Sequence, residues 1–463
     1  MKISVIGAGY VGLTTAACLA QIGHEVFCSE SDEDKLRKLQ NGVVPIYELG
    51  LDSIVTQAMR DGRLQFGSTN EAIDRSQIIF ICVGTPPLPN GDADLSAIEA
   101  LARSIARQAN GYKLIVEKST VPVQTASQLK RHLASRGSRG AEFEVASNPE
   151  FLREGTAVYD FLHPDRIVIG VDSPRAEKLL RELYAPIVTA NFTCPLHENC
   201  PERKPATLLV TDTNSSELIK HASNSFLAMK ISFINMISDL CEAAGADVAT
   251  VAKGIGLDPR IGAAFLNPGI GFGGFCFPKD VQAIVRIAEK FGCDFNLLKE
   301  VERINYSRID RFVEKIKKEL WVLRGKKIGV WGLAFKPHTD DVRFAPALSV
   351  IRQLLEEGVQ IQAYDPEAAE RAKKELPEIA YCKDAYEAAS GADAVLLLTE
   401  WPEFRELDFA RVAKTMERPL IIDGRNALAP DQLAAHGFEY VGIGGVRINN
   451  EKNAVQEGAA FAG

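Results

Sequence analysis

Short apolar runs recur along the first part of the chain. They occupy residues 2–6, 24–28, 78–83, 113–117 and 167–171, and each run predicts a buried strand. Segments with helical spacing separate them, beginning with an Ala- and Leu-rich stretch that ends near Ile22. Strands that alternate with helices predict a parallel sheet with helices on both faces.

The pattern changes in the middle of the chain. From Ser216 to Ala244 apolar residues recur at helical spacing, and neither Pro nor Gly interrupts them. They predict a long helix that is apolar on more than one side and is therefore buried between domains or subunits. A second helical stretch is expected from Val281 to Leu320, bent near Gly292.

The alternation of strands and helices returns near residue 326. Apolar runs at 326–331, 360–364, 394–398 and 420–423 predict a second parallel sheet. The sequence therefore predicts an α/β protein with two doubly wound domains, joined by a long central helix and a helical dimerisation domain. We expect domains at 1–210, 211–320 and 321–448, followed by a disordered tail at 449–463.

Composition narrows the range of partners. Apolar residues make up 46% of the chain and charged residues 25%, as in ordinary globular proteins. The net charge of −8 argues against a nucleic-acid or membrane-surface partner.

The nine cysteines are odd in number and scattered, which favours reduced thiols in the cytoplasm. The first residues imitate a signal peptide, but glycines interrupt the apolar run.

Those glycines form a Gly-x-Gly-x-x-Gly sequence between the first predicted strand and helix. Gly7 permits a tight turn, Gly9 lets a pyrophosphate approach the backbone, and Gly12 lets the helix pack closely on the strand. Tyr10 and Val11 lie at the start of the helix, whose amide groups attract phosphate. The segment predicts a Rossmann-like dinucleotide site.

Glu30 indicates which dinucleotide binds. It ends the second predicted strand, eighteen residues after Gly12. A carboxylate there accepts hydrogen bonds from both ribose hydroxyls and repels a 2′-phosphate, which favours NAD over NADP. Lys35 is a further candidate contact near the adenosine.

The segment Gly271-Phe-Gly-Gly-Phe-Cys-Phe-Pro-Lys-Asp280 predicts a reactive thiol. Three glycines allow the backbone to approach a ligand, and Lys279 and Asp280 follow Cys276 closely. A nearby cation lowers the pKa of a thiol from its usual value of about 8.5. A nucleophilic thiol and an NAD site together suggest oxidation through a thioester, which needs a base to activate water.

Residues 191–210 hold three prolines together with Cys194, His197 and Cys200. These two thiols and one imidazole could bind a metal ion. Three ligands within seven residues do not complete a tetrahedral zinc site by themselves. We therefore expect a surface excursion and no metal.

Further motifs resemble the UDP-glucose/GDP-mannose dehydrogenase family, and within it the branch that acts on UDP-glucose. They cover nearly the whole chain: Val83-Gly-Thr-Pro86, Lys118-Ser-Thr-Val-Pro122, Ser147-Asn-Pro-Glu-Phe-Leu-Arg-Glu-Gly155, Pro164-Asp-Arg-Ile-Val-Ile-Gly170, Glu217-Leu-Ile-Lys-His-Ala-Ser-Asn224, Lys230-Ile-Ser-Phe-Ile-Asn235, Gly332-Leu-Ala-Phe-Lys-Pro337 and Thr339-Asp-Asp-Val-Arg343. The resemblance implies an NAD-dependent, four-electron oxidation of UDP-glucose to UDP-glucuronate by a homodimer or larger homo-oligomer.

The resemblance also implies catalytic roles. Cys276 would form the thiohemiacetal and thioester, and Asp280 or Glu150 would activate the hydrolytic water. Lys220 and Asn224, one helical turn apart, would hold the sugar O6 and its developing negative charge. Thr120 would hold the water and border the nicotinamide.

Binding roles follow from the same motifs. NAD contacts would include Thr85, Thr120, Glu154, Lys279 and Arg343, in addition to the glycine turn, Glu30 and Lys35. The substrate contacts would be Glu150, Phe151, Leu152, Arg153, Glu154, Lys220, Asn224, Arg260, Phe265, Leu266, Asn267, Pro268, Gly269, Gly273, Lys336 and Arg425. Among these, Lys336 and Arg425 would meet the diphosphate, and Arg260 would reach the sugar in a neighbouring subunit.

The chain departs from the family pattern at several positions. Phe275 replaces a small residue before the thiol, Met236 an acid, and Gln124 a glycine, and the 191–210 segment is longer. Three alternatives stay open: a GDP-mannose 6-dehydrogenase, a two-electron hydroxyacid dehydrogenase and a non-catalytic nucleotide-binding protein. The second needs neither the cysteine nor a second α/β domain, and the third predicts loss of Cys276, Lys220 or Asp280.

Overall fold

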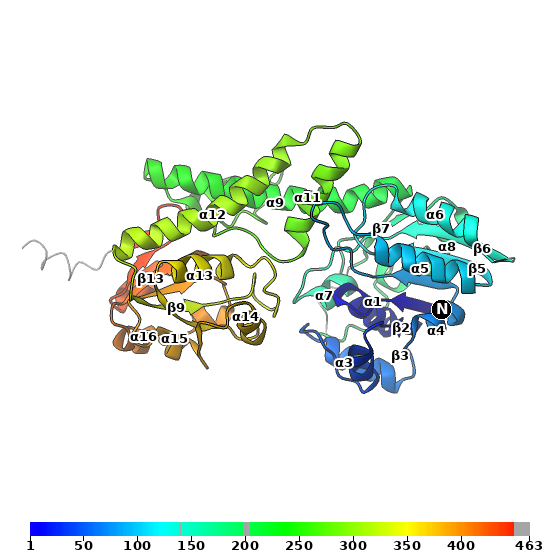
Figure 1. The fold of residues 1–463 in the computed structure, drawn as a ribbon, viewed down its shortest axis with the longest axis horizontal. Helices are drawn as coiled ribbons and strands as arrows, with labels where there is room; N and C mark the ends of the chain where they lie inside the picture. Colours follow the sequence, from blue (N-terminus) through cyan, green and yellow to red (C-terminus); the bar gives the residue numbers. More distant parts are fainter. Residues whose placement is uncertain (139, 198–199, 201–203, 449–463) are drawn as a thin grey trace, which may run out of the picture. The chain divides into compact units, whose positions relative to one another are not determined.

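The structure is a computed structural model that describes all residues except 139, 198–199, 201–203 and 449–463 (Figure 1). The expected tail at 449–463 thus lies outside the described residues. The chain divides into two compact units. The first contains Met1–Ser223 and Gln282–Cys293, and the second contains Asn224–Val281 and the residues from Asp294 onward.

The first unit is built on an eight-stranded sheet with the order β3-β2-β1-β4-β5-β6-β7-β8. Its strands are β1 (Lys2–Ile6), β2 (Glu25–Ser29), β3 (Leu64–Gly67), β4 (Ile78–Ile81), β5 (Gly111–Glu117), β6 (Ala141–Ser147), β7 (Arg166–Gly170) and β8 (Thr207–Thr211). All neighbours pair in parallel except β6 and β7, which meet antiparallel at Ser147 and Gly170. The parallel sheet confirms the prediction from the strand–helix alternation.

Two separate apolar cores show that helices cover both faces of this sheet. One core contains residues of α1 (Tyr10–Gln21), α3 (Leu51–Arg60), α7 (Ala157–Leu162) and α8 (Pro174–Val188). The other contains residues of α4 (Thr69–Arg75), α5 (Ser96–Gln108) and α6 (Thr125–Arg136). The short helix α2 (Glu33–Gln40) follows β2. The first unit is therefore doubly wound, as predicted.

The second unit carries a seven-stranded sheet with the order β11-β10-β9-β12-β13-β14-β15. Its strands are β9 (Lys327–Trp331), β10 (Gln360–Tyr364), β11 (Ala380–Tyr381), β12 (Ala394–Leu397), β13 (Leu420–Asp423), β14 (Glu439–Val441) and the antiparallel β15 (Arg447–Ile448). It also contains α13 (Pro346–Glu356), α14 (Ala369–Glu375), α15 (Ala385–Ala389), η1 (Pro402–Arg405), α16 (Phe409–Thr415) and α17 (Pro430–Ala435). This sheet confirms the second doubly wound domain.

The helices that follow β8 and precede β9 in the chain differ partly from expectation. The long helix is α9 (Thr213–Ala244), followed by α10 (Val248–Gly256). The expected bent helix from Val281 to Leu320 is wrong: α11 (Cys276–Lys290) and α12 (Asn296–Leu320) are separate helices. Gly292, at φ 71° just after α11, takes the left-handed conformation that commonly ends a helix.

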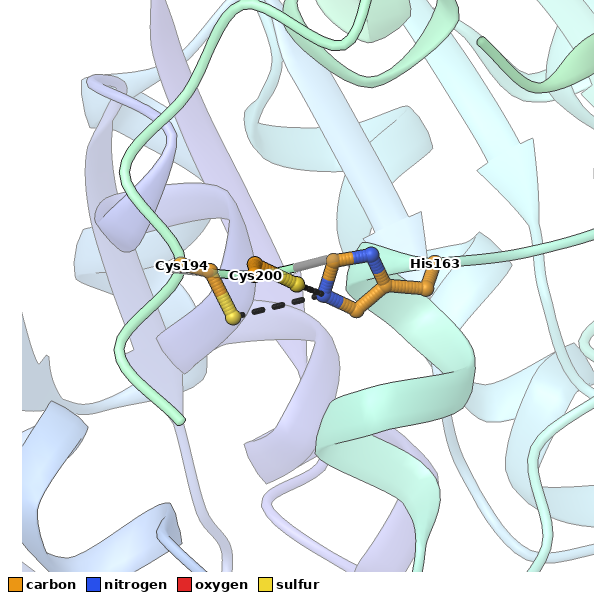
Figure 2. A group of neighbouring side chains, drawn as sticks. All are labelled: His163, Cys194 and Cys200. Carbon is orange, nitrogen blue, oxygen red and sulfur yellow. Dashed lines mark hydrogen bonds between the residues drawn. The ribbon is translucent and has the colours of Figure 1, made fainter. Parts of the chain in front are cut away.

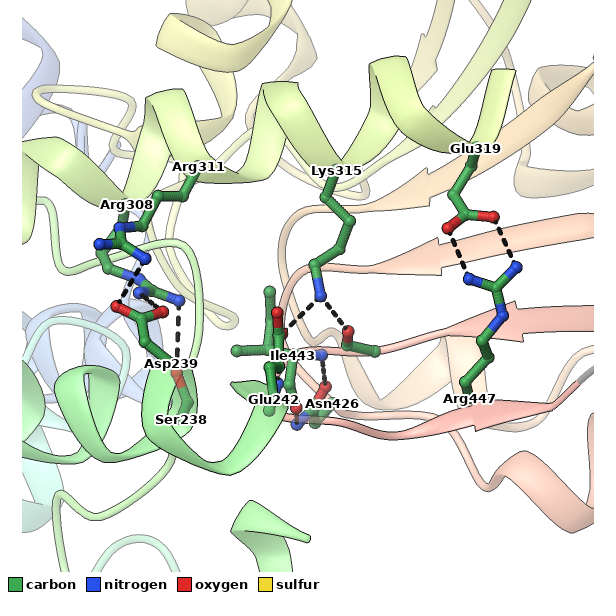
Figure 3. A network of polar contacts seen from close by, with 12 residues as sticks. Ser238, Asp239, Glu242, Arg308, Arg311, Lys315, Glu319, Asn426, Ile443 and Arg447 are labelled. Carbon is green, nitrogen blue, oxygen red and sulfur yellow. Dashed lines mark hydrogen bonds and ion pairs between the residues drawn. The ribbon is translucent and has the colours of Figure 1, made fainter. Parts of the chain in front are cut away.

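Ion pairs join α9 to α12, and a hydrogen bond ties α12 to a loop of the second sheet (Figure 3). On α12, Arg308 pairs with Asp239 of α9 at 2.5 Å, and both are largely buried. Lys315 bridges Glu242 of α9, at 2.5 Å, and the carbonyl oxygen of Gly442, at 3.0 Å. These contacts tie two helices and a strand-end loop into one framework within the second unit.

Among the described residues, no helix combines the length and the apolar character required to cross a bilayer.

Candidate active site

The glycine turn of the first unit has the geometry of a dinucleotide site. Gly7 has φ 98°, and a Cβ on Gly12 would lie 1.8 Å from the carbonyl oxygen of Gly7, so neither position accepts a side chain. A Cβ on Gly9 would meet no atom within 4 Å. Because Gly9 is the N-cap of α1, open space adjoins the free amide groups of that helix. The turn therefore fits a pyrophosphate.

Glu30 stands at the end of β2, where the ribose contact is expected. Its Oε2 lies 2.8 Å from Lys35 Nζ, and its Oε1 accepts hydrogen bonds from the amides of Ser31 and Asp32. Burial raises the pKa of Glu30, but the hydrogen bonds and the Lys35 charge outweigh burial and hold it below its usual value. The carboxylate is thus charged and stabilised in place, and Lys35 contacts it directly.

Glu48 was not singled out from the sequence, yet it organises the segment that carries several predicted contacts. Its carboxylate accepts hydrogen bonds from the amides of Gly155 and Ala157, each at 2.7 Å. The hydroxyl of Tyr10 accepts a hydrogen bond from the Gly155 amide as well. Burial raises the pKa of Glu48 to about 7. The segment next to Glu154 is thereby fixed beside the first turn of α1.

The other candidates of the first unit lie on the loops that follow β4, β5 and β6. The hydroxyl of buried Thr85 donates a hydrogen bond of 2.8 Å to the carbonyl oxygen of Thr120. The guanidinium of Arg153 pairs with Asp160 at 2.6 Å, and the ring of Phe151 lies under Arg166. Ligands of parallel α/β sheets bind outside the carboxyl ends of strands, and these loops lie there.

A buried ion pair joins two of the predicted catalytic residues. Lys220 Nζ on α9 lies 2.8 Å from Glu150 Oε1, and both side chains are almost fully buried. The other oxygen of Glu150 accepts a hydrogen bond of 2.6 Å from the amide of Leu152. Isolated buried charges are costly, so each of these two side chains serves as the partner of the other.

Buried ionisable groups next to this ion pair were missed by the sequence analysis. Burial raises the pKa of Glu117 well above its usual value and that of Glu217 to about 7. Glu217 accepts hydrogen bonds from the amides of Gln124 and Ala126. Burial also lowers the pKa of Lys118 to about 8. The sequence shows that these residues are present within the motifs, but it does not show which side chains they contact or that they are buried.

In the second unit, Cys276 is the first residue of α11, and it is exposed. The free amide groups of a helix N-terminus stabilise a thiolate. Asp280 follows one turn later on the same face of the helix and is buried. It accepts a hydrogen bond of 2.6 Å from Asn224 Nδ2 and pairs with Lys279 at 3.0 Å. The structure thus joins a thiol, a buried carboxylate and two of its donors.

The glycines before Cys276 fit closely against the protein itself. A Cβ on Gly273 would lie 2.3 Å from the carbonyl oxygen of Phe344, and one on Gly274 would overlap the ring of Phe335. Phe275, the departure from the family pattern, lies under the guanidinium of Arg343 at 4.5 Å. Arg343 is also bound to Asp341 at 2.7 Å. Glycine is therefore required at Gly273 by backbone packing, whatever the ligand.

Arg425 connects the second sheet to the cysteine loop. Its Nη1 donates to the carbonyl oxygen of Gly271 and its Nε to that of Leu398, both at 2.9 Å. A Cβ on Gly269 would lie 3.5 Å from Arg425 Nη1. Arg425, the expected diphosphate contact, is thus half-buried and bound to carbonyl oxygens beside the loop 265–269.

The remaining substrate candidates lie in different environments. In the loop 265–269, Phe265 has φ 65°, Leu266, Pro268 and Gly269 are buried, and Asn267 is exposed. Lys336 Nζ lies 5.6 Å from the ring of Phe335. Arg260 is highly exposed and paired with Asp258 at 2.6 Å.

Comparison with known proteins agrees with this geometry. The UDP-glucose/GDP-mannose dehydrogenase family matches in three parts: its NAD binding domain over residues 1–188, its central domain over 214–307 and its UDP binding domain over 329–430. The chain is 45% identical to a UDP-glucose 6-dehydrogenase of Rhizobium meliloti (strain 1021), over 96% of this chain and 99% of the relative.

Two further relatives give the same result. The UDP-glucose 6-dehydrogenase TuaD of Bacillus subtilis (strain 168) is 45% identical, over 96% of this chain and 93% of that protein. The solved structure of a UDP-glucose dehydrogenase from Pyrobaculum islandicum superposes with a TM-score of 0.86, at 38% identity, over 96% of this chain and 98% of that one. The chain therefore belongs to the UDP-glucose/GDP-mannose dehydrogenase family and is an NAD-dependent oxidoreductase.

Proposed function

We propose that this enzyme oxidises UDP-glucose to UDP-glucuronate in two hydride transfers, with Cys276 as the covalent nucleophile. The observation that carries the proposal is the arrangement on α11. An exposed thiol stands at the helix N-terminus, and the buried carboxylate of Asp280 lies one turn away, held by Asn224 and Lys279. This pairing of a nucleophile with a positioned base is the one that thioester chemistry requires.

The reaction balances through the thiol. The C6 alcohol loses a hydride and a proton to become an aldehyde, and the Cys276 thiolate adds to its carbonyl carbon. The oxygen of the adduct takes up the proton released in the first step, and the thiohemiacetal then loses that proton together with a second hydride to become a thioester. Water attacks the thioester and passes its two protons through the base to solvent; the carbon–sulfur bond breaks, and the carboxylate leaves while the thiolate is restored. Two NAD⁺ molecules, held one after the other at the first sheet, would each supply the acceptor for one hydride.

The surrounding residues take the following roles. Lys220 and Asn224 donate hydrogen bonds to the sugar O6 as negative charge develops on it. Asp280 orients or activates the water, with Glu150 as the other candidate base and Thr120 as a water ligand beside the nicotinamide. NAD is bound by the glycine turn and by further residues of the predicted site: Gly7, Gly9, Tyr10, Val11, Gly12, Glu30, Lys35, Thr85, Glu154, Lys279 and Arg343.

UDP-glucose is the proposed substrate, and GDP-mannose is the alternative. The names of the two bacterial relatives and of the archaeal structure support the first choice. The sugar nucleotide would be held by residues 150–154, Arg260, 265–269, Gly273, Lys336 and Arg425. The family's UDP binding domain spans the region of Lys336 and Arg425, which supports their assignment to the diphosphate.

The test counts NADH released per sugar nucleotide consumed. We expect two NADH and one UDP-glucuronate per UDP-glucose, and no acid from Cys276→Ala. Cys293→Ala, at another exposed cysteine, is the matched control and should keep full activity. One NADH with an aldehyde or keto product would refute the four-electron reaction, and faster turnover of GDP-mannose would refute the substrate.

The enzyme is also proposed to work as a homodimer in the cytoplasm. Phe226, Phe233, Met236 and Leu240 on α9 are between 40% and 63% exposed in the single chain. Phe226, Phe233 and Leu240 are spaced by seven residues, as in the seam of a coiled coil, so a second α9 would cover them. No disulfide joins any of the nine cysteines, all of which lie among the described residues, and this suits a reducing compartment. We keep 1–210, 211–320 and 321–448 as the proposed domain limits.

A further inference from the structure

Four sulfur and nitrogen ligand atoms converge at the end of α7 in the first unit. His163 is the C-cap of that helix, and Cys194, His197 and Cys200 belong to the segment between α8 and β8. His163 Nε2 lies 3.3 Å from the sulfur of Cys194 and 3.4 Å from that of Cys200 (Figure 2). His197 Nδ1 lies 3.8 Å from both sulfurs.

We propose that His163, Cys194, His197 and Cys200 bind a structural zinc ion. Ligand distances of about 2.3 Å for sulfur and about 2.0 Å for nitrogen put tetrahedral sulfur–nitrogen pairs about 3.5 Å apart. The four measured sulfur–nitrogen distances, from 3.3 to 3.8 Å, lie on both sides of that value. The ligand atoms of His163, Cys194 and Cys200 all lie within 4.8 Å of one another. His197 is exposed and lies outside that group of three, so its ring would have to turn toward the ion to complete the site.

Hydrogen bonding alone explains this arrangement poorly. A neutral imidazole nitrogen offers either one proton or one lone pair, so it forms one well-directed hydrogen bond. Here the single Nε2 of His163 faces two sulfurs, as Figure 2 shows, and both sulfurs also face His197. One cation that accepts a lone pair from each of the four atoms satisfies every contact at once.

The ligand set indicates which ion binds. Two thiolates and two imidazoles form the Cys₂His₂ set of structural zinc sites, whereas calcium and magnesium require oxygen ligands. The spacing Cys194-x-x-His197-x-x-Cys200 brings three ligands from one short segment. His163, thirty-one positions before Cys194, supplies the fourth that the sequence analysis lacked. All four positions are filled by protein, which is typical of a structural site.

The surroundings hold the ligands in place. The ring of His163 contacts Tyr159 and Phe192, with centroids 4.9 and 5.6 Å apart, and Cys194 is buried. Leu196 packs closely on Gly50: a Cβ added to Gly50 would lie 2.5 Å from Leu196 Cδ2. The ion would therefore fasten the long excursion between α8 and β8 to the end of α7.

The test begins with the wild-type chain, purified without chelator after growth in zinc-supplemented medium. We expect about one zinc per chain by elemental analysis, and unfolding at a lower temperature after a strong chelator removes it. Refilling with Co²⁺ should produce the visible bands of a tetrahedral ion and a thiolate charge-transfer band. These measurements require neither substrate nor NAD, so they are independent of the proposed reaction.

Variants locate the ion. His163→Ala and Cys200→Ser should lower the zinc content at least about tenfold, while Cys293→Ser, at an exposed cysteine outside the cluster, should keep it. Wild-type chain without zinc that also gives no cobalt–thiolate band would overturn the proposal, even if the variants failed to fold. A thiol titration in which Cys194 and Cys200 react only after reduction would also overturn the proposal, because it would show that they form a disulfide.

Discussion

Asn224 donates a hydrogen bond of 2.6 Å from Nδ2 to Oδ2 of Asp280, which joins α9 to α11. The other oxygen of Asp280 faces Lys279 at 3.0 Å. A carboxylate with two fixed donors has little freedom to reorient, so its position relative to the first turn of α11 is set before any ligand binds. This preorganisation is the feature that the proposed hydrolysis step uses.

Asp280→Asn tests that step. The amide keeps the shape but cannot accept a proton, so we expect kcat to fall by about 10²–10⁴-fold. A covalent sugar adduct on Cys276 should accumulate and be visible by mass spectrometry. Asp294→Asn, in the exposed loop between α11 and α12, is the control and should keep normal turnover. Normal turnover in Asp280→Asn itself would remove this residue from the mechanism.

Lys220 and Glu150 form a buried pair whose stability and catalytic roles can be separated. Lys220→Met leaves the Glu150 carboxylate buried without its partner, and we expect unfolding to become easier by about 3–5 kcal/mol. The double variant, Lys220→Met with Glu150→Gln, should recover most of that stability. Its kcat should nevertheless stay at least about 10²-fold below that of the wild type. Denaturant unfolding and steady-state kinetics give the two readouts. Recovered activity in the double variant would show that Lys220 is only structural.

Glu30→Ala tests the choice of cofactor. Loss of the two ribose contacts should raise the KM for NAD about thirtyfold, since each net hydrogen bond contributes about 1 kcal/mol. Without the carboxylate, discrimination against NADP should also weaken, because no negative charge remains to repel the 2′-phosphate. Glu33→Ala, at the exposed start of α2, is the matched control. An unchanged KM for NAD would remove Glu30 from the site.

The raised pKa values of Glu117 and Glu217 predict a pH-dependent stability. Both carboxyls are protonated more readily in the folded state than in the unfolded one. Their contribution is therefore complete below about pH 4.5 and is lost as pH rises, for Glu217 through about pH 7. Each group gives a slope of up to about 1.4 kcal/mol per pH unit.

Glu117→Gln removes one of these groups while it keeps a neutral, similarly shaped side chain. The free energy of unfolding should then fall less steeply between pH 5 and pH 7 than in the wild-type chain. Urea titrations at several pH values measure it, with Glu99→Gln on the exposed face of α5 as the control. Equal slopes in both variants would contradict the assignment of a neutral Glu117.

The exposed stripe on α9 predicts the oligomeric state. Phe233→Asp places a charge in the middle of the stripe, and burying an unpaired charge in a dimer interface is costly. We expect a monomer by analytical ultracentrifugation where the wild type is a dimer. Val322→Asp is also at an exposed apolar position but not on α9, and it should leave the mass unchanged. A monomeric wild type would refute the proposed dimer.

Local patterns in the sequence were sufficient for much of the fold. The strands at 2–6 and 360–364 follow from short runs of mostly apolar residues, and the long helix from 213 to 244 follows from apolar residues at helical spacing. The glycine turn was equally readable, because Gly7 has a positive φ and Gly12 packs on the carbonyl oxygen of Gly7 within the same turn; that Cys82 crowds both glycines was not readable. The break at Gly292 was missed because a glycine permits either a bend or a stop, and neighbouring packing selects between them.

Tertiary structure alone decided the partners of the functional groups. Glu150 and Lys220 are seventy positions apart, Asn224 and Asp280 fifty-six, and His163 and Cys194 thirty-one. The sequence determined which chemical groups the chain carries, and along one helix it also determined their spacing. Which groups meet, and which carboxyls lose water and keep their protons, depends on how distant segments pack, because burial and Coulomb forces act through space.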